Sequence, residues 1–93
     1  MSEKLKDEIS KLADSIFDDI KRVMDLNALE TLRIIVLGKK GKITNFLKEL
    51  KNLDYDSRIE IGTSLNHLKN NLLNEIEDKK IYLKEVELKK VLL

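Results

Sequence analysis

The sequence predicts an all-α fold, an antiparallel two-helix coiled-coil hairpin with two short helices at its tip. Two amphipathic stripes, one toward each end of the 93-residue chain, carry this prediction, and no proline interrupts either of them. The composition, 42% hydrophobic and 38% charged, suits one small domain over residues 1–93. A chain of this length buries only about 60–65% of its unfolded surface, which leaves little room for an enclosed catalytic cavity.

The first stripe predicts a helix near the N-terminus. Its apolar residues recur at intervals of three and four, which places them on one helical face while Asp and Lys cover the other. The stripe consists of Leu5, Ile9, Leu12, Ile16, Ile20 and Val23.

The second stripe predicts a long final helix. If it is continuous from Tyr55 to Leu92, it reaches ~57 Å at 1.5 Å per residue. The first helix covers only part of that length, so we expect it to pair antiparallel with the C-terminal half and to leave an apolar seam exposed. The seam is weakest at Lys79 and Lys80, where the next core residue is expected. The apolar residues of this stripe are Ile61, Leu65, Leu68, Leu72, Ile76, Leu83 and Val86.

Two short helices are expected between the stripes. The first begins near Asn27 and ends at Gly38, which we expect in the left-handed conformation. The second carries Ile43, Phe46, Leu47 and Leu50, and after it Asp54 or Asp56 is placed to cap the long helix. Gly62 lies inside that helix, where it costs roughly 1 kcal/mol against alanine, so we expect a packing reason for it.

Positive charge is concentrated in the middle of the chain. Residues 33–51 carry six basic side chains and one acidic side chain, in a protein whose formal net charge is only +1. Within them, the stretch LGKKGK (residues 37–42) places two of the three glycines around a lysine pair. One interpretation is a solvated turn between helices. The other is a loop that contacts a polyanion, because a local positive field attracts phosphate even on a nearly neutral protein.

Several classes of function find no support in the residues. Cysteine is absent, which excludes disulfides and thiolate metal sites and is compatible with a reducing cytosol. The stretch MSEKLKDEIS has no apolar signal-peptide core, and the run Ile34–Leu37 is far short of the ~20 residues that span a bilayer. We therefore expect a soluble, cytoplasmic protein. His67 has no ligand or triad partner and is expected at the surface.

A set of residues in a fixed order resembles a known family. Residues 37–41 read LGKKG, and the set continues on both sides with Arg33, Thr44, Leu47-Lys48, Arg58, Gly62, Asn66 and Lys69. Their order and spacing resemble the N-terminal arm of the bacterial phenylalanyl-tRNA synthetase alpha subunit over essentially the whole chain. Two positions depart from the family pattern: Val36 replaces a usual tyrosine, which questions aromatic stacking there, and Asp54-Tyr55 replaces a commonly proline-rich entry to the last helix.

The resemblance implies a tRNA-binding arm on a larger enzyme. In the family, this coiled coil precedes a class II catalytic domain that joins phenylalanine to its tRNA with ATP and magnesium, in an α2β2 assembly with the beta subunit. No class II catalytic motif is found here, so the chain itself should hold no cofactor and have no ligase activity. The apolar end Val91–Leu93 also suggests that the native chain continues.

Phosphate contacts are expected from the basic middle segment. Lysines on a glycine-flexed loop can follow phosphates, which supply affinity without reading sequence. We expect Lys39, Lys40 and Lys42 to make these contacts. Further candidates are Arg33, Lys48, Lys51 and Arg58.

Two alternatives to this function remain open from sequence. A coiled-coil protein-interaction module would use the uncovered seam of the long helix and associate without salt sensitivity. A stand-alone enzyme would need a cleft that the sequence does not supply.

Overall fold

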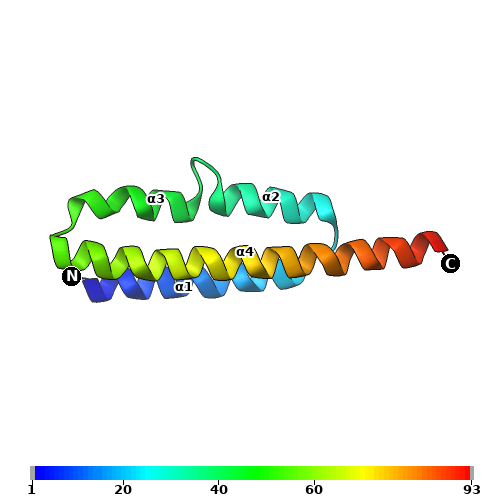
Figure 1. Ribbon diagram of the computed structural model, residues 1–93, viewed down its shortest axis with the longest axis horizontal. Coiled ribbons are helices and arrows are strands. Elements are labelled where there is room, and N and C mark those ends of the chain that lie inside the picture. The colour runs from blue at the N-terminus through cyan, green and yellow to red at the C-terminus, as the bar shows by residue number, and fades with distance from the viewer. Residues whose placement is uncertain (1, 93) are drawn as a thin grey trace.

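The computed structural model describes residues 2–92, and every regular secondary-structure element in that range is a helix. The all-α prediction is confirmed, as are two long helices with two short ones between them in the chain (Figure 1). Met1 and Leu93, the last residue of the apolar end noted above, lie outside the described residues. The elements are α1 (Ser2–Arg22), α2 (Leu26–Leu37), α3 (Lys42–Glu49), a 3-10 turn (Leu50–Asn52) and α4 (Tyr55–Leu92).

The first helix runs parallel to α4, so the predicted antiparallel pairing of these two helices is wrong. Near its start, Lys6 forms an ion pair with Glu60, and at its end the Lys21 carbonyl oxygen accepts a hydrogen bond of 3.1 Å from the Lys79 amine. The sequence separation is 54 residues at the first contact and 58 at the second. A nearly constant separation means that both helices advance in the same direction.

The reason lies in the course of the two short helices. The link at residues 23–25 reverses the chain, and α2 and α3 then run back along α4 rather than sitting only at a tip (Figure 1). Leu26 and Leu29 of α2 lie beside Ile76, while Leu50, after α3, lies beside Gly62. The chain has therefore returned to its starting end before α4 begins, and α4 must repeat the direction of α1. The antiparallel arms of the hairpin are α2–α3 and α4.

One apolar core runs between the helices. Val36 and Ile43 from the short helices are buried in the same cluster as Ile16 of α1 and Leu72 of α4. This burial confirms the stripes read from the sequence and is the main stabilising contribution, at roughly 25 cal/mol per Å² of apolar surface removed from water. The α4 residues in the core are Ile61, Leu65, Leu68, Leu72, Ile76 and Leu83.

The ends of α4 follow the sequence prediction closely. Its 38 residues match the predicted range, and the molecule extends 57 Å along its longest axis. Asp54 caps its start, because the Ser57 N–H donates to the Asp54 carboxylate at 3.5 Å. Hydrogen bonds from Ser57 lower the pKa of Asp54; the larger effect comes from the Ser57 side chain and the smaller one from its backbone N–H.

Lys79 replaces a core residue where α1 stops. The last carbonyl groups of a helix lack intrahelical partners and carry partial negative charge. The Lys79 amine donates to the Lys21 carbonyl oxygen in the last turn of α1, and it also lies 5.4 Å from the centre of the Tyr82 ring. The break in the apolar stripe thus marks the end of the partner helix. Beyond it, Leu83 of the predicted stripe is still buried, so the structure does not confirm an uncovered seam there. The exposed apolar side chains in this part of α4 are Ile81, Tyr82 and Leu88, which lie off the stripe.

Burial of Ile16 and Leu72 predicts that Asp at either position unfolds the chain. Both side chains are almost fully buried, and an unpaired carboxylate there costs several kcal/mol, comparable to the ~5 kcal/mol stability of a small domain. Circular dichroism and thermal melting check this. Leu73→Asp is the matched control: Leu73 is 41% exposed, so this variant should keep its helicity and melt within a few degrees of the parent. Equal melting of Leu72→Asp and Leu73→Asp would contradict the packing described here.

The part of α4 that extends past the end of α1 predicts uneven stability along this helix. Amides after Leu83 should exchange with solvent much faster than those near Leu72 in dilute solution, because α1 and α2 no longer cover the helix there. At high concentration the exposed side chains of Ile81, Tyr82 and Leu88 should instead support dimerisation, and the exchange should slow. Hydrogen exchange combined with sedimentation measures both effects. A monomer equally protected at Leu72 and Leu88 would argue against this.

Candidate nucleic-acid interface

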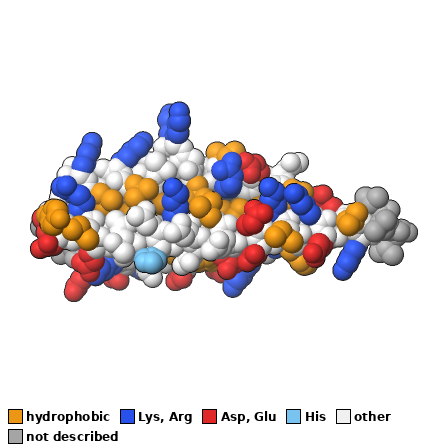
Figure 2. Space-filling view, in the orientation of Figure 1, with side chains coloured by type: hydrophobic (Ala, Val, Ile, Leu, Met, Phe, Trp, Pro, Cys, Tyr) orange, Lys and Arg blue, Asp and Glu red, His pale blue; other side chains and the backbone are white. Residues whose placement is uncertain are grey.

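Five of the seven predicted cations lie along one edge of the molecule. Lys39 and Lys40 lie in the loop between α2 and α3, Lys42 and Lys48 lie on α3, and Lys51 lies in the 3-10 turn. All five side chains are exposed. Figure 2 shows Lys and Arg side chains projecting from the edge that α2, the loop and α3 form in Figure 1. We call these five lysines the basic edge.

The loop is a compact turn. The Gly38 N–H donates to the Ile34 carbonyl oxygen at 2.9 Å, and the Gly41 N–H donates to the Gly38 carbonyl oxygen at 2.8 Å. The Thr44 hydroxyl donates to that same Gly38 oxygen, also at 2.8 Å. These bonds hold the backbone on both sides of Lys39 and Lys40, so the structure does not show the glycine-flexed loop that we expected.

The glycines serve close packing and not an unusual backbone conformation. Gly38 has φ −69° and ψ 175°, which is extended, so the predicted left-handed conformation is wrong. A Cβ on Gly38 would lie 2.5 Å from the Ile34 carbonyl oxygen, and one on Gly41 would lie 2.7 Å from the Val36 carbonyl carbon. Neither position has room for a side chain. The loop can fold this tightly only with glycine at both ends of the lysine pair.

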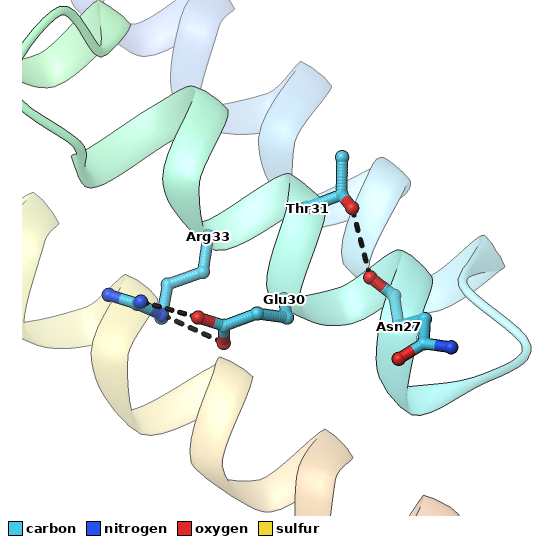
Figure 3. Close-up of polar contacts among 4 residues, drawn as sticks. All are labelled: Asn27, Glu30, Thr31 and Arg33. Carbon is cyan, nitrogen blue, oxygen red and sulfur yellow. Dashed lines mark hydrogen bonds and ion pairs between the residues drawn. The ribbon is translucent and has the colours of Figure 1, made fainter.

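Three of the seven predicted cations bind other groups of the chain. Arg33 donates to Glu30 at 3.0 and 2.5 Å (Figure 3), Lys48 donates to the Lys39 carbonyl oxygen at 3.4 Å, and the Arg58 guanidinium donates to the Leu53 carbonyl oxygen at 3.1 Å. Lys48 and Arg58 therefore support the loop and the start of α4 from their side chains.

The ion pair of Arg33 is a surface feature. Its hydrogen bond lowers the pKa of Glu30 and raises that of the Arg33 guanidinium. In Figure 3 the Thr31 hydroxyl also turns back to the Asn27 carbonyl oxygen, at 3.0 Å. Since Glu30 already neutralises Arg33, this arginine contributes less free positive charge than a lysine of the basic edge.

The remaining lysines are available to a ligand. The side chains of Lys39, Lys40, Lys42 and Lys51 make no hydrogen bond or ion pair to another of the described residues. A fixed backbone therefore presents four positive side chains to solvent. Such an arrangement suits the oxygens of a polyanion, which need positive charge and little geometric precision.

Reactive chemistry has no comparable site in the described part of the chain. One hollow of about 430 Å³ lies between α1 and α3, over Leu12 and Phe46, and is open to solvent. Over residues 2–92 no group of three or more metal-ligating side chains occurs, and no helix is long and apolar enough to cross a membrane. His67 is exposed, as predicted.

A second group of cations was missed by the sequence analysis. Lys21, Arg22, Lys79 and Lys90 line one hollow where α1 ends against α4. They come from residues 1–32 and 52–93, in each of which acidic residues outnumber basic ones. The net charge of either segment therefore gives no sign of a basic cluster. The parallel course of α1 and α4 brings them together.

The sequence of the chain is similar to those of known proteins. Residues 24–92 match a family model described as aminoacyl tRNA synthetase class II, N-terminal domain. The phenylalanine–tRNA ligase alpha subunit of Latilactobacillus sakei is 38% identical over 86 residues, which are 92% of this chain and 24% of that protein. The alpha subunit of Legionella pneumophila is 39% identical over 80 residues, covering 86% of this chain and 24% of its own. No solved structure matches the chain.

These findings define the class of protein. The chain belongs to the family of class II aminoacyl-tRNA synthetase N-terminal domains. The relatives just described are alpha subunits of phenylalanine–tRNA ligase, which confirms the resemblance seen in the sequence. The chain spans about a quarter of the length of these relatives.

Two positions of the family pattern have different surroundings in the structure. Val36, where the family usually has tyrosine, is only 1% exposed, so this side chain is part of the core. Gly62 has only the Leu50 side chain near the place of a Cβ, at 3.5 Å, which is an ordinary contact. The expected tight packing at Gly62 is therefore absent, and both Asn66 and Lys69 are exposed on α4.

Gly41, which lies against backbone atoms, and Gly62, which does not, predict opposite effects of alanine on the free energy of unfolding. Gly41→Ala should lower the free energy of unfolding by about 1–3 kcal/mol, because the methyl group clashes with the backbone at Val36. Gly62→Ala should raise it by about 0.5–1 kcal/mol, because alanine is the better helix former and meets only a flexible leucine side chain. Urea unfolding followed by circular dichroism measures both. If Gly41→Ala is as stable as the parent chain, the loop is not closely packed.

Proposed function

We propose that this chain is the tRNA-binding arm of a phenylalanine–tRNA ligase alpha subunit and that its basic edge contacts the phosphate backbone of tRNA. The observation that supports this is the set of four lysines without intramolecular partners on a hydrogen-bonded turn, in a member of a tRNA synthetase family. Phosphate contacts supply affinity, and folded RNA is recognised largely through its shape and backbone.

The shape of the molecule suits this role. It measures 57 × 21 × 16 Å, and the basic edge follows one long side of it. A preorganised rod positions its lysines before binding, so little conformational entropy is lost when RNA docks.

The proposal places the chemistry elsewhere in the parent protein. The parent would work in the cytoplasm as an α2β2 enzyme with its beta subunit and would use ATP and magnesium in a class II catalytic domain. The arm would hold the tRNA while that domain forms phenylalanyl-tRNA.

A protein-interaction module is the second candidate, because Ile81, Tyr82 and Leu88 are exposed on α4. Apolar association through these residues would depend little on salt, whereas phosphate binding weakens steeply as salt rises. Salt titration of each kind of complex therefore distinguishes the two functions.

Replacing Lys39, Lys40 and Lys42 with Ala should weaken tRNA binding by about tenfold or more at moderate salt. If these lysines neutralise two or three phosphates, the slope of log affinity against log salt should become shallower by roughly two. In the complete enzyme, amino-acid activation by ATP should be nearly unchanged, because the adenylate forms in another domain. Fluorescence anisotropy with labelled tRNA(Phe) and an ATP–pyrophosphate exchange assay measure the two effects.

The matched control is Lys4→Ala, Lys11→Ala and Lys84→Ala together. These lysines are exposed, lie outside the basic edge and make no ion pair among the described residues, so the same loss of charge should change binding little. Unchanged affinity and salt slope in the Lys39, Lys40 and Lys42 variant would mean that the loop is only a solvated turn.

A further inference from the structure

The four cations missed by the sequence analysis surround one hollow at the end of α1. Lys21 and Arg22 come from the last turn of α1, while Lys79 and Lys90 come from α4. The hollow has a volume of about 290 Å³ and also contains Met24 of the link between α1 and α2. We call it the basic hollow.

No carboxylate lines the basic hollow. Glu75 and Asp78 line a neighbouring hollow instead, which shares Lys21, Lys79 and Tyr82 with it. None of the four cations forms an ion pair with another of the described residues. Four like charges that converge without a counter-charge repel one another, and an anionic ligand would remove that repulsion.

Helix capping explains only part of this arrangement. Lys21 and Arg22 suit the negative end of the α1 dipole, and the Lys79 amine binds the Lys21 carbonyl oxygen at 3.1 Å. A capping role does not require Arg22 or Lys90 to face the same hollow, and neither side chain makes a hydrogen bond to a described residue. These two side chains remain free to bind a ligand.

An aromatic ring gives the basic hollow a second kind of contact. Tyr82 is 57% exposed and Met24 is 85% exposed, so both offer apolar surface between the cations. The Lys79 amine lies 5.4 Å from the centre of the Tyr82 ring. Cations around an exposed aromatic ring are the combination that binds unpaired nucleotides, through phosphate contacts and base stacking.

The basic hollow lies within reach of the RNA held by the basic edge. It adjoins the start of α2, whereas the lysine loop follows its end, and α2 has 12 residues. At 1.5 Å per residue the two sites are about 18 Å apart along the helix. Helices hold both sites in place, so for an RNA molecule that engages both of them the second contact is intramolecular.

We propose that the basic hollow is a second RNA-binding site, which contacts phosphates through Arg22 and Lys90 and stacks an unpaired base on Tyr82. This inference rests on the proposed function, since it concerns the same RNA that the basic edge binds. It adds a site at the far end of α2 and a base contact that the basic edge lacks.

The test compares two double variants of the chain in binding to tRNA(Phe). Arg22→Ala with Lys90→Ala should weaken binding by roughly three- to tenfold at about 0.1 M salt and make the salt slope shallower by one to two. Both side chains are exposed and free of hydrogen bonds to described residues, so the fold should persist, as circular dichroism can verify. The control, Lys4→Ala with Lys11→Ala, removes the same charge elsewhere and should bind like the parent.

Ultraviolet cross-linking provides a readout that does not depend on charge. With tRNA bound, the tryptic peptide Ile81–Lys84, which contains Tyr82, should carry a nucleotide adduct in mass spectrometry. Tyr82→Leu should abolish the adduct and leave the salt slope unchanged, because it removes the ring and no charge.

The outcomes separate this inference from the proposed function. If Arg22→Ala with Lys90→Ala binds like the control, or if the Ile81–Lys84 peptide carries no adduct, the second site is wrong while the basic edge can still stand. If polyglutamate displaces the cross-link as well as RNA does, the basic hollow is an acidic-protein site and the inference also fails. If the parent chain does not bind tRNA at all, both proposals fail.

Discussion

The apolar stripe of α4 must be buried away from water, and this requirement positions every other helix in the molecule. The buried residues from Ile61 to Ile76 form a stripe along α4 that no single short helix could cover. α1 covers one side of this stripe, and α2 and α3 together cover the other. The compact lysine loop exists because the second cover is made of two short helices that must join at the surface. The position of the basic edge is thus a consequence of apolar packing.

Much of this packing could be predicted from the sequence, but the direction of the helices could not. A period near 3.6 identifies the buried face of a helix, and the absence of proline defined the extent of α4. Periodicity carries no information about whether two packed helices are parallel or antiparallel. The number of times the chain reverses decides this direction: α2 and α3 together run back along the molecule, so α1 and α4 must be parallel. The sequence analysis placed α2 and α3 at a tip and therefore predicted an antiparallel α1 and α4.

The candidate site shows a similar division. Charge density along the chain located six of the seven predicted cations, those within residues 33–51, because they are close in sequence. It could not separate Arg33, Lys48 and Arg58, which bind neighbouring groups, from the lysines that face solvent, since that depends on side-chain contacts. It also missed the basic hollow, whose residues meet only because α1 ends beside Lys79. The glycines were recognised as unusual, but their reason is contact with the backbone.

The end of α1 beside Lys79 also divides the molecule mechanically. Between its start and Lys79, α4 lies beside α1 and beside α2 and α3, which together resist bending. Beyond Leu83, α4 is a single helix without a lateral partner among the described residues. Bending stiffness rises steeply with cross-section, and single helices curve readily. The bundle of α1, α2, α3 and the first part of α4 should therefore move as one rigid body, while the part of α4 beyond Leu83 bends. Such bending would reorient the bundle without changing the distances between the lysines that it carries.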